Sequence, residues 1–342
     1  MKQHLAPSLA DSICDTRTRK IKRQFFTQIN NLLDWDSISL EIDKYYHRGK
    51  SAVGNPSYDG LLLFKMCLLQ TWYGLSDYEV EDRINDSLSF SYFCGLPIDS
   101  VAPDHSTLSR FRSALTKSGG FDVLFKKINA QLEANQIIIK SGAIVDASVV
   151  NTPLRPKGKT NHAVTQDRED EVAVKKDYAS SVDTQASWLK KRGKYHYGYK
   201  KHHVTDNEGL ILGVVTTKAS TNEISNLEEV LKSADLPKGI ALKADKGYQS
   251  DKNAELLKSM QLKNHILKKA KKNKPLTDRE KSFNKAVGKT RFKVERSFGS
   301  IKRWFNGGVA RYRGIAKMHT QNLMEAICYN LYRSPAIIAS NS

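Results

Sequence analysis

The chain has 342 residues and 39% hydrophobic side chains, enough for about two domains with buried cores, which excludes wholesale disorder. Lysine and arginine number 55 against 36 acidic residues, and the net charge of +19 favours a polyanionic partner such as nucleic acid. No apolar run approaches the roughly 18 residues of a membrane span, and the four cysteines lack paired spacing, so we expect a cytoplasmic protein without membrane, zinc or disulfide sites.

The first part of the chain, residues 1–135, is expected to be an all-helical domain. Gly74 should end one helix, and Ser76 and Glu79 have the spacing of a capping box that begins the next. The apolar residues that recur at helical spacing before Gly74 are Leu61, Leu62, Met66, Leu69 and Trp72.

A basic helix is expected to follow Asp104 and to carry Arg110 and Arg112. Several short helices with tight turns and a basic last helix are typical of a helix-turn-helix module. We therefore expect this domain to bind DNA through both arginines. A plain helical bundle would show the same periodicity, so that alternative stays open.

Residues 136–335 show a different pattern, in which strands and helices alternate. Two β-rich runs, 137–139 and 143–145, begin it, and the polar stretch 151–187 is expected to be a long loop. Residues 206–209 have the composition of a hairpin turn between two further strands. The order of elements predicts an α/β fold, with a mixed sheet flanked by helices.

Two aspartates stand at the ends of predicted apolar strands. Asp146 follows Gly-Ala-Ile-Val, and Asp245 follows Ile-Ala-Leu-Lys-Ala. Functional groups of open α/β sheets collect at the carboxyl ends of strands. An aspartate at such a place is also a common turn or helix-cap residue, so neither position is decisive alone.

A third acid, Glu295, lies on a predicted helix together with Arg291 and Lys302. At about 100° per residue the three charges share one side of the helix, next to an apolar stripe that includes Val294 and Phe298. A simple helical salt bridge between Arg291 and Glu295 is the alternative, and it would contribute only a few tenths of a kcal/mol.

Asp146, Asp245 and Glu295 together fit one type of chemistry. Phosphodiester hydrolysis needs an activated oxygen nucleophile, charge relief on the phosphate and a stabilised leaving oxygen. Two Mg²⁺ ions about 4 Å apart supply all three, and Mg²⁺ prefers hard oxygen ligands with few protein contacts. The three carboxylates are therefore candidate metal ligands.

Several motifs of this chain also resemble a known family. Arg291, Glu295 and Lys302 keep the spacing of a catalytic-helix signature of Tyr, Arg, Glu and Lys, in which Gly288 stands at the tyrosine position here. The other matching segments are residues 68–77, 103–107, 144–148, 195–200, 244–248 and 309–314. In this order they resemble the bacterial insertion-sequence DDE transposases of the IS-five family over nearly the whole chain.

The resemblance implies an RNase H-like fold for residues 136–335 and a transposase activity. Such an enzyme binds the terminal inverted repeats of its element, cleaves the DNA ends and joins them to target DNA. It implies catalysis with two Mg²⁺ ions, or Mn²⁺ as a substitute, held by Asp146, Asp245 and Glu295, with Lys302 also at the site. Because two DNA ends must be cut together, we expect a homodimer on double-stranded DNA in the bacterial cytoplasm, associated with the nucleoid.

The residues expected to contact DNA are Arg291, Lys302, Arg110, Arg112, Lys194, Lys200, Lys201, Arg311 and Arg313. Basic residues interleave with tyrosines over residues 194–201, which suits phosphate contacts and base stacking. Only alternate residues of a strand can meet one duplex, and a solvated charged strand is the competing interpretation. A DNA-binding protein with a decayed active site and a nuclease without strand transfer also remain open.

Overall fold

The computed structural model describes residues 20–46, 58–97, 99–156, 161–166, 172–177, 181–191, 193–270 and 275–341. The described residues before position 135 form helices and no strands, as expected. They are α2 (Lys20–Leu32), α3 (Trp35–Ile42), α4 (Gly60–Tyr73), α5 (Asp77–Asp86), α6 (Leu88–Cys94), α7 (His105–Ser118) and α8 (Gly120–Ala134). No described helix is long and apolar enough to cross a membrane.

The predicted start and end residues of three of these helices are confirmed. Gly74 ends α4 in the left-handed conformation, with φ of 67°, which glycine adopts without steric cost. Ser76 and Glu79 form the reciprocal hydrogen bonds of a capping box at the start of α5. Asp104 caps α7 by accepting hydrogen bonds from the backbone of Ser106 and Thr107.

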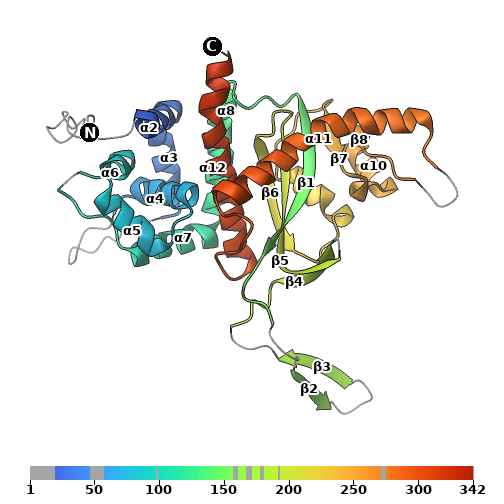
Figure 1. Ribbon diagram of the computed structural model, residues 1–342, viewed down its shortest axis with the longest axis horizontal. Coiled ribbons are helices and arrows are strands. Elements are labelled where there is room, and N and C mark those ends of the chain that lie inside the picture. The colour runs from blue at the N-terminus through green and yellow to red at the C-terminus, as the bar shows by residue number, and fades with distance from the viewer. Residues whose placement is uncertain are drawn as a thin grey trace.

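The rest of the chain builds a mixed sheet with helices packed against it, which confirms the predicted α/β class (Figure 1). In the sheet β5 pairs antiparallel with β1, β4 and β6, while β7 lies parallel to both β1 and β8. The strands are β1 (Gly142–Asn151), β4 (Ser187–Lys191), β5 (Lys194–Thr205), β6 (Ile211–Lys218), β7 (Ala241–Ala244) and β8 (Lys263–Ile266). The helices are α9 (Leu227–Lys232), α10 (Asp251–Ser259), α11 (Asp278–Trp304) and α12 (Ile315–Asn341).

Helix α12 connects the two parts of the molecule. It packs against β6 of the sheet and against α4 and α8 of the helical part, and Figure 1 shows it between them. Its buried face includes Leu323, Ile327 and Leu331, which belong to one hydrophobic cluster with residues of both parts. Burial of this apolar surface is the main stabilising contribution at the junction.

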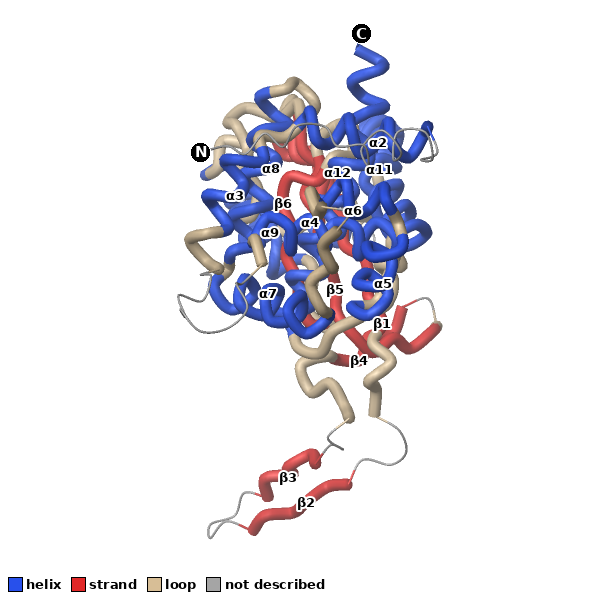
Figure 2. The backbone as a smooth tube through the Cα atoms, turned by 90° about the vertical axis from the view of Figure 1, so that its left-hand side faces the viewer, coloured by secondary structure: helices blue, strands red, loops and turns tan. Residues whose placement is uncertain are grey.

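Two expectations about the sheet domain were wrong. Residues 151–187 contain more than a loop: β2 (Asn161–Gln166) and β3 (Val172–Asp177) pair antiparallel and form a ribbon apart from the main sheet (Figure 2). A polar sequence does not prevent such a ribbon, because backbone groups of the two strands satisfy each other. The apolar run 137–139 is no strand either, because the amides of Ile137 and Ile138 both donate to the Leu132 carbonyl and close the end of α8.

Candidate active site

The register between two parallel strands places Asp146 beside Asp245. Strands β1 and β7 are neighbours in the sheet, and Val145 of β1 is level with Ala244 of β7. Each of these two residues is followed by an aspartate, so Asp146 in the middle of β1 lies beside Asp245, which directly follows β7. The side chain of Asp146 is 17% exposed and that of Asp245 is 37% exposed, so both carboxylates reach a partly solvated site.

Helix α11 brings the third acid to the same place. It packs on β1 through Val294 and Phe298, which contact Ile144. At its side Lys293 forms an ion pair with Glu208 at 2.8 Å, and Arg296 donates a hydrogen bond to the Glu208 carbonyl, so the turn between β5 and β6 holds the helix. With this face docked, Arg291 reaches Asp146 in the middle of β1 and Asp245 directly after β7, and Glu295 lies one helical turn from Arg291.

Arg291 contacts all three carboxylates. Its Nη1 lies 3.0 Å from Oδ1 of Asp245, and its Nη2 lies 2.8 Å from Oε1 of Glu295. The same Nη2 lies 3.4 Å from Oδ2 of Asp146. The structure thus brings together three acids that are far apart in sequence. It also gives Arg291 acidic partners within the protein, where we had expected a DNA phosphate.

Electrostatics at this site favour an added positive charge. The pKa of Asp146 is raised to about 6, mainly by burial and in part by the nearby carboxylates of Glu223 and Asp245, while Arg291 and a backbone hydrogen bond from Ala147 oppose this rise. A bound cation would return the pKa of Asp146 to lower values because it stabilises the ionised form. Protonation of Asp146 below about pH 6 would compete with such a cation.

The donor set suits a hard divalent ion, because it consists of carboxylate oxygens. As the side chains stand, no group of three acidic, histidine or cysteine residues in the described part of the chain is gathered closely enough to hold a metal. The Arg291 guanidinium lies among these acids and contacts each of them. The chemistry of the site therefore fits a metal, and its present geometry fits a guanidinium.

Two residues near the carboxylates were not predicted from the sequence. Glu223 forms an ion pair with Lys200 at 3.3 Å, and its Oε2 lies beside the Gly247 backbone. The Tyr248 hydroxyl is buried and has no hydrogen-bond partner among the described residues. Burial raises the pKa of Tyr248 well above its ordinary value, and the charges of Glu223, Asp146 and Asp245 add to this.

A sequence signal existed for one of these two residues and not for the other. Tyr248 belongs to the segment 244–248 that we had matched, so its position after Asp245 was a usable signal. Glu223 belongs to no motif and approaches the site only through the tertiary fold. Buried Asn253 fixes this approach, because its Nδ2 donates to the carbonyls of both Ile224 and Tyr248.

Two lysines expected to contact DNA are buried instead. Lys201 is 0% exposed, and its Nζ lies 2.7 Å from Oε2 of Glu325 and 2.8 Å from the Gly307 carbonyl oxygen. Lys200 is 5% exposed and is committed to Glu223 and the Thr221 carbonyl. We correct the expectation for both, since a buried charge needs local partners and is unavailable to a duplex.

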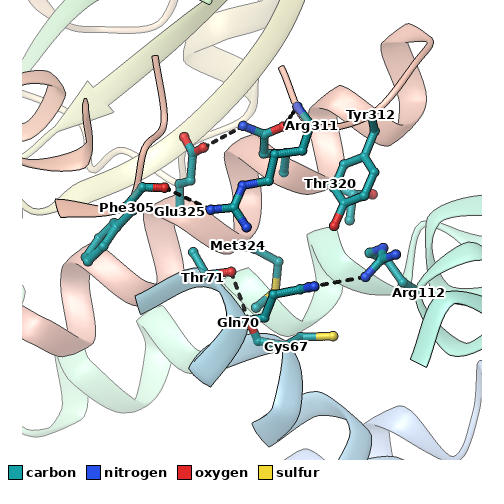
Figure 3. A pocket seen from close by; sticks show the side chains of 11 residues that line it. Cys67, Gln70, Thr71, Arg112, Phe305, Arg311, Tyr312, Thr320, Met324 and Glu325 are labelled. Atoms are coloured by element: carbon teal, nitrogen blue, oxygen red, sulfur yellow. Dashed lines mark hydrogen bonds between the residues drawn. The ribbon is translucent and has the colours of Figure 1, made fainter. Parts of the chain in front are cut away.

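Two of the expected arginines also have internal partners. Figure 3 shows Arg112 and Arg311 lining a polar pocket between the helical part and α12. Arg112 forms an ion pair with Asp77 at 2.6 Å and lies over the Tyr312 ring. Arg311 donates to the carbonyls of Leu75 and Phe305. Arg112 is 8% exposed, so the expectation of DNA contact is corrected for Arg112; Arg311 is half-buried, and its contact with DNA stays a prediction.

The remaining expected contacts are accessible. The exposed residues are Arg110, Lys194, Lys302 and Arg313. Lys302 follows Glu295 by about two turns of α11, and no ion pair among the described residues involves it. Partial burial of its stem and the charges of Lys201 and Lys191 lower its pKa. Lys302 is therefore free to meet an anion that approaches the carboxylates.

Comparison with known proteins gives matches over both parts of the chain. Residues 139–331 match a family model described as "Transposase DDE domain", and residues 15–114 match one described as "Transposase domain (DUF772)". The chain is 36% identical over 227 residues to a Neisseria meningitidis serogroup B protein named transposase for insertion sequence element IS1106. This alignment covers 66% of the chain and 76% of the relative. Among solved structures, a piggyBac transposase synaptic complex with hairpin DNA gives a TM-score of 0.40 at 11% identity, covering 94% of this chain and 75% of the other.

Proposed function

Because this chain belongs to the transposase DDE domain family, we propose that it cuts DNA at the ends of an insertion sequence and joins those ends to target DNA. The observation that carries the proposal is the convergence of Asp146, Asp245 and Glu295 on one cationic group. A site that gathers three carboxylates around a cation suits the metal-dependent chemistry of this family. The spacing of Arg291, Glu295 and Lys302 supports a place among the IS-five-like members.

Members of the family generally use divalent metal ions. We propose that Asp146, Asp245 and Glu295 hold two Mg²⁺ ions, for which Mn²⁺ can substitute. When bound, these ions would supply an activated oxygen nucleophile and charge relief at the scissile phosphate. The exposed ammonium of Lys302 would bind a DNA phosphate on the same side of α11 and orient the strand.

The two parts of the chain would have different functions, DNA recognition and catalysis. In this proposal residues 1–135 recognise the terminal inverted repeats, and residues 136–335 carry the reaction. Arg110 of α7 and Lys194 of β5 are among the exposed basic groups of the two parts and would make phosphate contacts. The overall charge of +19 would then give binding a steep dependence on salt. Two copies of the chain would hold the two ends, at the nucleoid of a bacterial cell.

The experiment that tests this function uses the full chain and a DNA duplex carrying the repeats that flank its gene. With Mg²⁺ we expect cleaved ends, and with added target DNA we expect joined products. Chelation of the metal should abolish both. Cleavage without joining would replace the proposal with a nuclease, and tight binding without cleavage would replace it with a DNA-binding protein.

A further inference from the structure

Arg291 is surrounded by acids to an unusual degree. Its guanidinium lies within 3.4 Å of Asp146, Asp245 and Glu295, and its side chain is 18% exposed. An arginine always carries its charge, and its planar fork can serve several carboxylate oxygens at once. Charge-assisted hydrogen bonds of this kind are among the stronger polar contacts in proteins. Arg291 therefore supplies these acids with a positive charge from within the chain.

A guanidinium and a divalent ion cannot use these oxygens in the same way. The guanidinium holds them about 3 Å from two nitrogen atoms, whereas Mg²⁺ draws its ligands to about 2.1 Å from one centre. The described acids are in fact too far apart to hold a metal while Arg291 lies among them. Binding of an ion must consequently break contacts of Arg291 and bring the carboxylates closer.

The helix limits how far Arg291 can withdraw. Arg291 and Glu295 are one turn apart on α11, whose docked residues Val294 and Phe298 keep the helix on β1. The guanidinium could therefore leave the carboxylates by a movement of the Arg291 side chain alone, while the helix stays in place. The released side chain would remain beside the site with its donors unpaired, ready to bind an anion such as a DNA phosphate.

We propose that Arg291 sets the metal affinity of this site, as an internal cation that a divalent ion must displace from Asp146, Asp245 and Glu295. This inference rests on the proposed function, because it assumes that the three acids are the metal ligands. It assigns Arg291 an action in the free protein, before any DNA is bound. The competition lowers the affinity for the ion and couples metal binding to release of a phosphate-binding group.

Direct Mn²⁺ binding to the full chain without DNA tests the proposal. We expect Arg291→Gln to bind Mn²⁺ about tenfold more tightly than the wild type, because the competing charge-assisted bonds are gone. The free Mn²⁺ concentration can be followed by electron paramagnetic resonance. Lys289→Gln is the matched control: it removes the same charge from an exposed position of the same helix, and at about 100° per residue this position faces away from Arg291. The control should bind Mn²⁺ within about twofold of the wild type, by the small effect of exposed charges.

A second variant covers a failure of Arg291→Gln to fold. Arg291→Lys keeps the charge and loses the planar fork, so it should bind Mn²⁺ more tightly than the wild type, by less than about tenfold. If wild type binds Mn²⁺ and the folded Arg291 variants bind it equally or more weakly, the displacement idea is wrong while the proposed function stands. If neither wild type nor variants bind Mn²⁺ at millimolar concentration, the metal-dependent function itself is refuted.

Discussion

Replacement of Asp146 or Asp245 by Asn, or of Glu295 by Gln, is expected to lower DNA-end cleavage about a thousandfold or more, since each removes a charged metal ligand worth several kcal/mol in the transition state. The amide has nearly the shape of the carboxylate but lacks its charge. Each variant also removes one acidic partner of Arg291, so the protein should still fold around the remaining two.

Cleavage and DNA binding should be measured separately for these variants. Single-turnover cleavage of an end-labelled duplex reports the chemical step, and fluorescence anisotropy in the absence of metal reports binding. We expect binding to change by less than about threefold, because the three acids make no favourable phosphate contact. Glu228→Gln is the matched control, since it removes an exposed acid paired with Lys232. Wild-type cleavage by any one of the three variants would remove that residue from the metal site.

Replacement of Lys201 by Met is expected to lower the free energy of unfolding by about 3–5 kcal/mol, the usual cost of breaking a buried ion pair. Lys201 and Glu325 are 0% and 2% exposed and lie 2.7 Å apart. Without the ammonium group, the Glu325 carboxylate would be buried without its charged partner. Urea denaturation followed by circular dichroism measures the loss.

The origin of this effect can be checked with a second change at the same pair. In the double variant Lys201→Met, Glu325→Gln no charge remains buried, so part of the lost stability should return. Lys218→Met, at an exposed position of β6, should stay within about 0.5 kcal/mol of the wild type. A Lys201→Met protein with unchanged stability and weaker DNA binding would favour the surface role that the sequence suggested.

Much of the fold could be predicted because local patterns and tertiary structure agree. The capping box at Ser76, the left-handed Gly74 and the hairpin turn at 206–209 depend on neighbouring residues alone. The β2–β3 ribbon was missed because its polar sequence has no apolar alternation to mark the strands.

The proximity of the two aspartates could also be expected, because both follow apolar runs that pair as parallel strands; Asp245 does follow the end of β7, but Asp146 lies in the middle of β1, which continues to Asn151. The burial of Lys200 and Lys201 could not be predicted. Strand β5 lies inside the sheet, between β1 and β6. Helices α9, α11 and α12 pack against it. In such a strand the side chains on both faces of the sheet are buried. The sequence alone does not show which strand will be central.

The position of Arg291 illustrates the same limit at the site. Helical spacing places it on the face of Glu295, and the structure agrees. Its contacts with Asp146 and Asp245 depend on how α11 docks across two strands, which no local pattern encodes. The shared helix face of Arg291 and Glu295 could thus be predicted, while the contacts of Arg291 with Asp146 and Asp245 could be found only from the fold.

The central claim is that Asp146, Asp245 and Glu295 form one metal site. A crystal of the full chain soaked in Mn²⁺ and measured at the manganese absorption edge tests this directly. We predict anomalous density within about 2.2 Å of oxygens from all three carboxylates, with the Arg291 guanidinium moved away from them. Well-ordered carboxylates still bound to Arg291, with manganese elsewhere or absent at saturating concentration, would contradict the account.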